Sequence, residues 1–284
     1  MLGRSRSWLQ RLLSRENGAK DHSLEGSAAV PDAVAPSFAA VGPYYDVLMS
    51  SVPYRSWVDY VQRLLQRFEA HPQAVLDLAC GTGMVGAEIA RRGCPRVFGV
   101  DLSEGMARVA AEEGRLRVAV QDARALGLKP GSLDLVVSLY DSLNYILEPS
   151  GLSACFQAVR DCLTPGGLFI FDLNTIRALA LDLFTQDNLR SADPLVYSWR
   201  SHWDERSRVC TVRMWFRWSD GEETHEFVEV HRQRGYRDDE VQALLRKAGL
   251  DILAAYDAYS FDPLHSRSTR VFYVAQREAP ESRP

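Results

Sequence analysis

A glycine-rich segment from Asp77 to Gly86 holds the clearest chemical pattern in this sequence. Gly81, Gly83 and Gly86 have the G-x-G-x-x-G spacing, which lets a backbone approach a ligand closely where a strand turns into a helix. Asp101 lies about 20 residues after the first glycine, where a dinucleotide site has the acid that binds its ribose. The spacing alone therefore predicts a nucleotide-type cofactor and allows NAD.

Asp77 argues against a cofactor that bears phosphates. Its carboxylate ends an apolar strand four positions before Gly81, where it would repel a pyrophosphate held at the N-terminus of the following helix. A cofactor with an ammonium and a sulfonium group and no phosphate would be attracted instead. Asp101 and Asp122 end the next two predicted strands, so three acids are expected at three successive strand ends.

Four segments resemble the motifs of class I S-adenosylmethionine-dependent methyltransferases. They are V-L-D-L-A-C-G-T-G at 75–83, V-F-G-V-D-L-S at 97–103, Q-D-A at 121–123 and L-T-P-G-G at 163–167. The first has Ala79 where the family often has glycine, and the resemblance spans roughly 44–277. It implies S-adenosylmethionine as the cofactor, bound by Asp77, Ala79, Gly81, Thr82, Gly83, Asp101, Leu102, Met106, Asp122, Ala123 and Tyr140.

The segment before the first strand is similar to the entry segment of bacterial small-molecule methyltransferases, some of which share Y-D-x-L-M and V-P-Y-x-x-W. In such enzymes it folds over the cofactor as a lid. The resemblance therefore makes Tyr45 a candidate catalytic residue and Tyr54 and Trp57 candidates for substrate contact, since aromatic faces suit a cation. Ordinary helix packing is the alternative role for all three.

A polar segment, L-Y-D-S-L-N-Y-I, follows the fourth predicted strand. An open α/β sheet binds its ligands at the carboxyl ends of its strands, so Tyr140, Asp141 and Asn144 are expected to line the reaction site. Asp141 and Asn144 are candidate catalytic residues, and Asp141 or a tyrosine could take a proton from the acceptor. Capping of the following turn is the alternative role for Asp141.

Strand and helix patterns alternate from residue 53 onward, which predicts an α/β fold with parallel strands. The expected strands are 74–78, 96–100, 116–121, 133–139, 168–173, 251–256 and 270–275, and the expected helices include 84–92, 104–113, 151–163 and 238–248. Ser103 is positioned to cap the second of these helices. With the resemblance, this pattern implies a Rossmann-like, doubly wound, mostly parallel seven-stranded sheet whose last strand is antiparallel.

An alternating pattern at 209–218 interrupts this order and predicts an antiparallel sheet inserted at about 195–234. Four tryptophans, three arginines and His231 in it allow an RNA-binding alternative through stacking and charge. Acids such as Glu226 and Glu229 dilute that charge, and its histidines lack the paired spacing of a metal site. We therefore expect neither nucleic acid nor a metal, and place substrate specificity in this insert.

Residues 1–40 are expected to form a flexible arm outside the domain at 41–277, with a disordered tail at 278–284. Apolar residues at helical spacing among arginines in the first 15 positions allow a short basic amphipathic helix with weak membrane-surface contact. No apolar run approaches the roughly 20 residues of a membrane span. The five scattered cysteines contain no C-x-x-C pair, which favours a reducing, cytoplasmic location.

The sequence thus predicts an enzyme that moves a methyl group to a nitrogen or oxygen of a small molecule. A net charge of -4 disfavours a protein built to coat nucleic acid. The alternatives are an NAD-dependent oxidoreductase, an RNA methyltransferase and a cofactor-binding module without catalysis. Nothing in the sequence indicates an oligomeric state.

Overall fold

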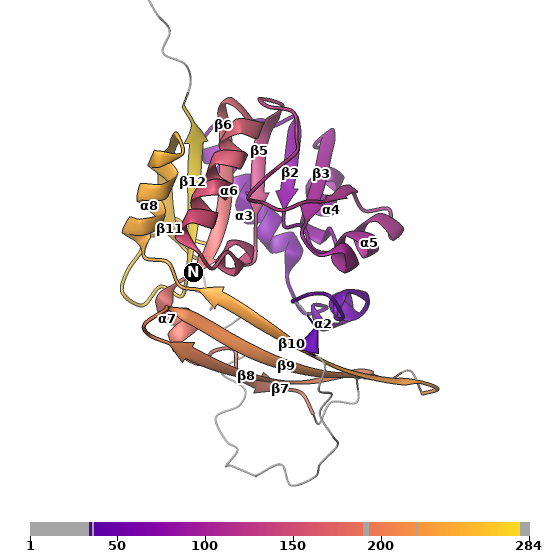
Figure 1. The fold of residues 1–284 in the computed structure, drawn as a ribbon. Coiled ribbons are helices and arrows are strands. Elements are labelled where there is room, and N and C mark those ends of the chain that lie inside the picture. Colours follow the sequence, from indigo (N-terminus) through magenta and orange to yellow (C-terminus); the bar gives the residue numbers. More distant parts are fainter. Residues whose placement is uncertain (1–33, 36, 190–192, 220, 279–284) are drawn as a thin grey trace, which may run out of the picture.

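Two β-sheets organise the computed structural model, which describes residues 34–35, 37–189, 193–219 and 221–278 (Figure 1). The larger sheet has the spatial order β11 (Leu250–Asp257), β12 (Arg270–Arg277), β6 (Leu163–Asn174), β5 (Leu133–Ser138), β2 (Ala74–Leu78), β3 (Arg96–Asp101), β4 (Arg117–Val120). The smaller sheet has the order β1 (Val34–Ala35), β10 (Thr224–Arg234), β9 (Val209–Ser219), β8 (Leu195–Asp204), β7 (Gln186–Asp187). Within the described residues, no helix is both long and apolar enough to cross a bilayer.

The larger sheet is parallel except at its last strand. β12 runs antiparallel to both of its neighbours, β6 and β11, whereas the other pairs are parallel. All five residues of β2 are buried, because helices cover both faces of such a sheet. The predicted doubly wound sheet with an antiparallel last strand is confirmed.

Helices pack on both faces of the larger sheet (Figure 1). They are α3 (Tyr54–Arg67) and α4 (Met84–Arg91) on one face, α6 (Pro149–Cys162) and α8 (Asp238–Lys247) on the other, and α5 (Glu104–Glu112) against β3 and β4. Ser103 caps α5, as predicted, with its hydroxyl accepting from the backbone N–H of Met106. Short elements complete the fold: η1 (Gly42–Tyr44), α2 (Tyr45–Leu48), η2 (Ser142–Tyr145) and α7 (Ile176–Ala180).

The smaller sheet lies across the edge of the larger sheet at which the parallel strands end (Figure 1). Its strands β8, β9 and β10 are antiparallel, which confirms the predicted insert. Along β9, Cys210, Val212, Met214 and Phe216 are buried, while the residues between them are at least partly exposed. This two-residue period gives the sheet one apolar face, which is turned toward the larger sheet.

The end of the predicted arm belongs to the fold. Val34 and Ala35 pair in parallel with β10, and the backbone N–H groups of Phe38 and Ala40 donate to the buried Glu229. The boundary at residue 40 is therefore corrected, because this carboxylate binds a stretch of chain that composition alone marked as flexible. The amphipathic helix and residues 279–284 of the tail lie outside the described residues.

Candidate active site

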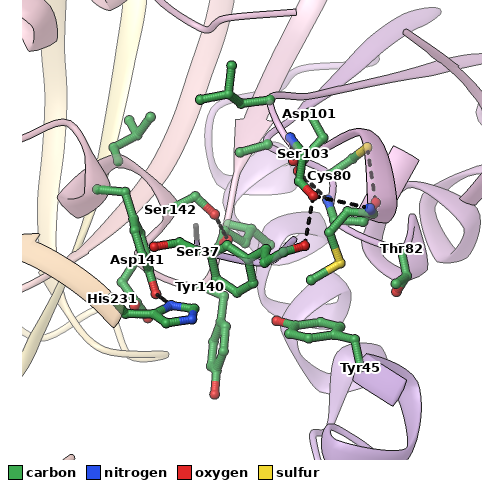
Figure 2. Close-up of a pocket in the computed structure, with 18 of the residues that line it drawn as sticks. Ser37, Tyr45, Cys80, Thr82, Asp101, Ser103, Tyr140, Asp141, Ser142 and His231 are labelled. Carbon is green, nitrogen blue, oxygen red and sulfur yellow. Dashed lines mark hydrogen bonds between the residues drawn. The ribbon is translucent and has the colours of Figure 1, made fainter. Parts of the chain in front are cut away.

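A cavity of about 1390 Å³ lies between the two sheets. Single small-molecule sites span roughly 300–1,000 Å³, so this cavity has room for two ligands side by side. Figure 2 shows Asp101 and Thr82 at one side and Asp141 and His231 at the other. We call these the donor side (Asp77–Thr82, Asp101–Met106, Asp122, Ala123) and the acceptor side (Tyr45, Tyr140, Asp141, Tyr145, His231, Gln233). Gly83, which the sequence predicts to bind the cofactor, is not among the described lining residues, because it faces α5, where a Cβ would meet Ala110 and Leu116 at 3.3 Å.

The loop after β2 brings a buried carboxylate and an open backbone together on the donor side. Asp77 accepts a hydrogen bond of 2.8 Å from the backbone N–H of Gly86, where any side chain would come within 3.0 Å of that carboxylate. Gly81 has a φ of +56°, and a Cβ there would meet no atom within 4 Å. Ala79 adopts a left-handed φ of +58°, which is costly for a residue with a side chain. Burial raises the pKa of Asp77 to about 7, although the Gly86 hydrogen bond opposes the shift.

Asp101 connects two segments of the donor side. Its carboxylate accepts from the backbone N–H of Gly81 at 2.8 Å and from that of Ser103 at 2.8 Å. Burial raises its pKa, and these two hydrogen bonds oppose the shift. Beside it, Leu102 is 67% exposed although it is a large apolar residue, as expected of a side chain that a ligand would cover.

Other residues predicted to bind the cofactor also line the cavity: Met106, Asp122 and Ala123 on the donor side, and Tyr140 on the acceptor side. Met106 is buried, whereas Asp122 keeps 31% of its side chain exposed. Arg124 forms a paired contact with the Asp122 carboxylate at 2.5 and 2.9 Å. Its guanidinium lowers the pKa of Asp122, so this acid is held ionised in the cavity rim.

Thr82 joins the glycine loop to the segment that precedes α3. Its hydroxyl donates to Asp46 at 2.6 Å, and Arg115 donates to the other oxygen of the same carboxylate at 2.6 Å. Thr82, predicted to bind the cofactor, lines the cavity, but its hydroxyl is already engaged by Asp46. The chain around α2 is therefore tied over the cavity by an ion pair and a hydrogen bond.

Two consecutive left-handed residues follow β5 on the acceptor side. Tyr140 has a φ of +68° and Asp141 a φ of +54°; such strain persists only where neighbouring groups hold it. Asp172 does so by accepting from the backbone N–H of Tyr140 at 2.6 Å and from that of Asp141 at 3.2 Å. Arg270 bridges the two acids, contacting Asp141 at 2.7 Å and also Asp172.

This ion cluster is buried beside the cavity. Arg270 is 6% exposed and Asp172 is fully buried. Burial raises the pKa of Asp141, and the guanidinium of Arg270 opposes that shift. Two carboxylates face one guanidinium, so the cluster has a formal charge of −1 when both acids are ionised.

Aromatic rings surround the middle of the cavity. Trp57 is 1% exposed and stacks on Tyr140 with a centroid distance of 4.9 Å, while Tyr54 meets Trp57 edge-on at 5.2 Å. All three line the cavity, together with Tyr45. Burial raises the pKa of the Tyr45 and Tyr140 phenols, which therefore stay protonated at neutral pH.

Asn144 does not reach the cavity and is withdrawn as a catalytic candidate. It is fully buried, its amide nitrogen donates to the backbone oxygens of Asn174 and Arg234, and its oxygen accepts from the N–H of Asn174. It is absent from the residues that line the cavity in the described part of the chain. Its amide instead joins η2 to the ends of β6 and β10.

Several acceptor-side residues were not predicted from the sequence. Gln233 donates to Asp141 at 2.5 Å, and Tyr145 lies 2.9 Å from a ring nitrogen of His231. His231 and Glu229 are almost fully buried, so neither contributes to a surface charge pattern of the kind considered for RNA. One signal in the sequence could have found them, the two-residue period of β10. Glu229, His231 and Gln233 alternate in step with the apolar Phe227, so they are expected on the same face of the strand.

The donor side suits a cationic cofactor without phosphates. Within the described residues, no Lys or Arg bonds to Asp77 or Asp101, whose carboxylates are bound by backbone N–H groups alone. The open space beside Gly81 would let a ligand lie against the backbone. Two acids and an exposed loop backbone are a poor match for a pyrophosphate and a good one for an ammonium group and a ribose.

The chain is similar to known methyltransferases. A family model described as a methyltransferase domain matches residues 75–167. "Putative methyltransferase YqeM" of Bacillus subtilis (strain 168) is 30% identical over 247 residues, covering 84% of this chain and 96% of that protein. A protein of Geobacillus sp. (strain WCH70), also named as a methyltransferase, is 30% identical over 244 residues, covering 82% of this chain and 97% of its own length.

Solved structures share the fold. An S-adenosylmethionine-dependent methyltransferase from Clostridium acetobutylicum superposes with a TM-score of 0.74 and 28% identity, covering 84% of this chain and 97% of its own. The sugar N-methyltransferase KedS8 from Streptoalloteichus has a TM-score of 0.73 at 20% identity, covering 91% of this chain and 100% of its own. At 20% identity, the similarity to KedS8 concerns the fold alone.

Proposed function

This chain belongs to the S-adenosylmethionine-dependent methyltransferases, and we propose that it methylates the nitrogen of a small-molecule amine. The cofactor, when bound, supplies an electrophilic methyl group on a cationic sulfur. The protein's own residues hold the acceptor in line with that group, which is the main source of catalysis in such a displacement. Residues Asp77, Asp101 and Asp122 are proposed to hold the cofactor, as the sequence predicts.

The charge of the acceptor side is the observation that supports an amine. Tyr45, Tyr140 and Tyr145 line the cavity together with Asp141, whose ion cluster has one carboxylate in excess of its guanidinium. An aliphatic amine is cationic at neutral pH, and both aromatic faces and a carboxylate attract such a cation. The same surroundings would repel a carboxylate or phosphate group.

The basic residues of the cavity support the same choice. Among the described lining residues these are Arg108, Arg124 and Arg270, and each is paired with an acid. None of the three is left to bind an anionic acceptor. Neighbouring structures include a sugar N-methyltransferase and an amino pentose methyltransferase, which act on amines by their names.

Matched acceptors test the proposal. The protein is incubated with S-adenosylmethionine and with glucosamine or glucose, and with cyclohexylamine or cyclohexanol, while release of S-adenosylhomocysteine is followed. The amine of each pair is expected to react and the alcohol to remain unchanged, because only the amine matches the charge at Asp141. Equal methylation of the alcohols, or methylation of carboxylic acids in the same assay, would overturn the choice of nitrogen.

The raised pKa of Asp77 predicts a pH-dependent affinity for the cofactor. Below pH 7 this acid is mostly protonated in the free protein, so binding a cation must first expel the proton, at up to about 1.4 kcal/mol for each pH unit. Calorimetry with S-adenosylmethionine is expected to show affinity rising between pH 5.5 and 8 and then levelling.

Asp77→Asn is the control for this pH dependence. The variant should bind more weakly at pH 8 and show a flatter profile than the wild type, because position 77 no longer has a carboxylate to titrate. A wild-type affinity that is constant across the range would contradict the role given to Asp77.

A further inference from the structure

The inner face of β10 has a stripe of polar residues in apolar surroundings. Glu229, His231 and Gln233 alternate along the strand and therefore point to the same side. Their partners across the sheet on β9 are Met214, Val212 and Cys210, all apolar and buried. Buried polar side chains at three successive inward positions are costly unless each is hydrogen-bonded. Each has a partner, and two of them form a chain that leads to the cavity.

The chain runs from Glu229 through His231 to Tyr145. Glu229 lies 2.8 Å from Nε2 of His231, and the Tyr145 hydroxyl lies 2.9 Å from Nδ1 of the same ring. Glu229 is fully buried and His231 is 2% exposed, whereas Tyr145 and His231 both line the cavity. The histidine ring therefore connects a buried carboxylate to a hydroxyl at the acceptor side.

The surroundings of Glu229 determine the direction of these hydrogen bonds. Its carboxylate accepts from the backbone N–H groups of Phe38 at 2.9 Å, Ala40 at 2.7 Å and Val41 at 3.0 Å. Both oxygens of Glu229 thus serve as hydrogen-bond acceptors. Nε2 of His231 must then carry the proton that it donates to Glu229. Nδ1 has a lone pair, and it accepts from the hydroxyl of Tyr145.

We propose that Tyr145, His231 and Glu229 form a relay that removes a proton from the amine acceptor. This inference rests on the proposed function, since it concerns the protonation of that amine. Tyr145 is the residue expected to touch the acceptor. His231 and Glu229 act through it, by receiving the proton and by stabilising the resulting charge.

The relay resolves a conflict in the acceptor side. An amine attracted as a cation has no free electron pair and cannot attack a methyl group. The ammonium gives one proton to the oxygen of Tyr145 while Tyr145 passes its own proton to Nδ1 of His231, leaving a neutral amine and an imidazolium beside Glu229. The nitrogen then bonds to the methyl carbon, and the electron pair of the broken carbon–sulfur bond goes to sulfur. The methylated ammonium leaves, and the imidazolium then passes its proton through Tyr145 to water in the emptied cavity, so each turnover releases one proton to solvent.

The groups that face the relay favour this direction of transfer. Asp141 and Tyr140 approach Tyr145 from the turn after β5, Tyr45 approaches from α2, and Glu229 lies behind the histidine. Burial raises the pKa of Tyr145 well above its usual value, so the phenol stays protonated and passes protons on. The Phe38 and His231 rings pack in a T-shaped arrangement at 4.6 Å between centroids, which limits water at the histidine.

A spectroscopic experiment tests the relay without any acceptor. Full-length protein with 15N-labelled histidine is bound to S-adenosylhomocysteine, and the ring nitrogens of His231 are assigned by comparison with His231→Gln. At pH 7 we expect a protonated Nε2 and an unprotonated Nδ1. Tyr145→Phe should move the Nδ1 resonance toward that of an imidazole nitrogen whose lone pair accepts no hydrogen bond. A proton on Nδ1, whether alone or in an imidazolium, would overturn the proposal, because the ring could not accept another.

Kinetics with the best amine of the matched pairs tests the catalytic consequence. Tyr145→Phe should lower kcat at pH 7 by about 100-fold, with the KM for the amine and the affinity for S-adenosylhomocysteine within about twofold of wild type. The loss should shrink as the pH rises above the pKa of the amine itself, because the acceptor then arrives deprotonated. A structural defect would not recover in this way.

Tyr236→Phe is the matched control. It also removes a phenol hydroxyl that bonds within the turn at 145–146, since Tyr236 donates to the backbone oxygen of Ile146, but Tyr236 is not among the described lining residues. It should keep the wild-type pH profile. An unchanged kcat in Tyr145→Phe, or a loss that persists at high pH, would overturn the relay. Failure of every amine to react would overturn the proposed function, and the nitrogen spectra would then decide the relay alone.

Discussion

Replacing Arg270 by methionine is expected to lower the free energy of unfolding by about 3–5 kcal/mol, the usual cost of removing one partner from a buried ion pair. The substitution leaves Asp141 and Asp172 facing each other in the interior without a cation. Denaturant unfolding at pH 7 measures the loss. It should be smaller at pH 5, because two uncompensated buried carboxylates take up protons more readily than they do in the unfolded chain.

Arg277→Met is the matched control, since this arginine lies on the same strand but bonds to the backbone oxygens of Asp161 and Leu163. Arg277→Met should lower the free energy of unfolding clearly less than Arg270→Met does. Adding Asp141→Asn and Asp172→Asn to Arg270→Met should recover part of the stability by removing the buried charges. A loss below about 1 kcal/mol in Arg270→Met would mean that this cluster is not held by charge.

Replacing Asp101 by alanine is expected to weaken S-adenosylhomocysteine binding by about 100-fold. A hydrogen bond to a charged group contributes about 1.5–3 kcal/mol, and a tenfold change in affinity corresponds to about 1.4 kcal/mol. The substitution removes the proposed contacts to the ribose and also releases the N–H groups of Gly81 and Ser103. Calorimetry measures the change.

Asp134→Ala is the control for the loss of hydrogen bonds to backbone N–H groups, which also occurs in Asp101→Ala. Asp134 also accepts from two backbone N–H groups, those of Gln73 and Ala74, at 2.9 and 3.0 Å, and it is not among the described residues that line the cavity. Its loss should cost stability and leave affinity within about twofold. An Asp101→Ala variant with nearly wild-type affinity would show that this acid does not bind the cofactor.

The donor side was predictable because its residues lie in short segments. Asp77, Ala79 and Gly81 lie in one turn, and Asp101 ends the next strand, so spacing along the chain determines their arrangement. The larger sheet followed from the same regularity, since parallel strands joined by helices leave their carboxyl ends at one edge. The start of the domain was misplaced, because Glu229 binds Phe38 across 191 positions of sequence.

The acceptor side depended on contacts that no local pattern contains. Asp141 meets Arg270 from 129 positions away and Gln233 from 92. Asn144 had the right position after a strand but turned inward, because its amide satisfies backbone groups of β6 and β10. A polar residue after a strand can therefore either line the site or satisfy buried backbone groups, and contacts distant in sequence determine which of the two it does.

The division of the cavity between two sheets has a consequence for how such an enzyme can be retargeted. Val212, Met214 and Phe216 project into the cavity from β9, whereas the glycine loop and its acids belong to the larger sheet. Mutations or recombination confined to the hairpin of β9 and β10 would change this wall of the cavity and leave the proposed methyl-donor site as it is. We therefore expect changes within the 26 residues from Val209 to Arg234 to alter specificity, together with the acceptor-side residues outside the hairpin, while the glycine loop stays as it is.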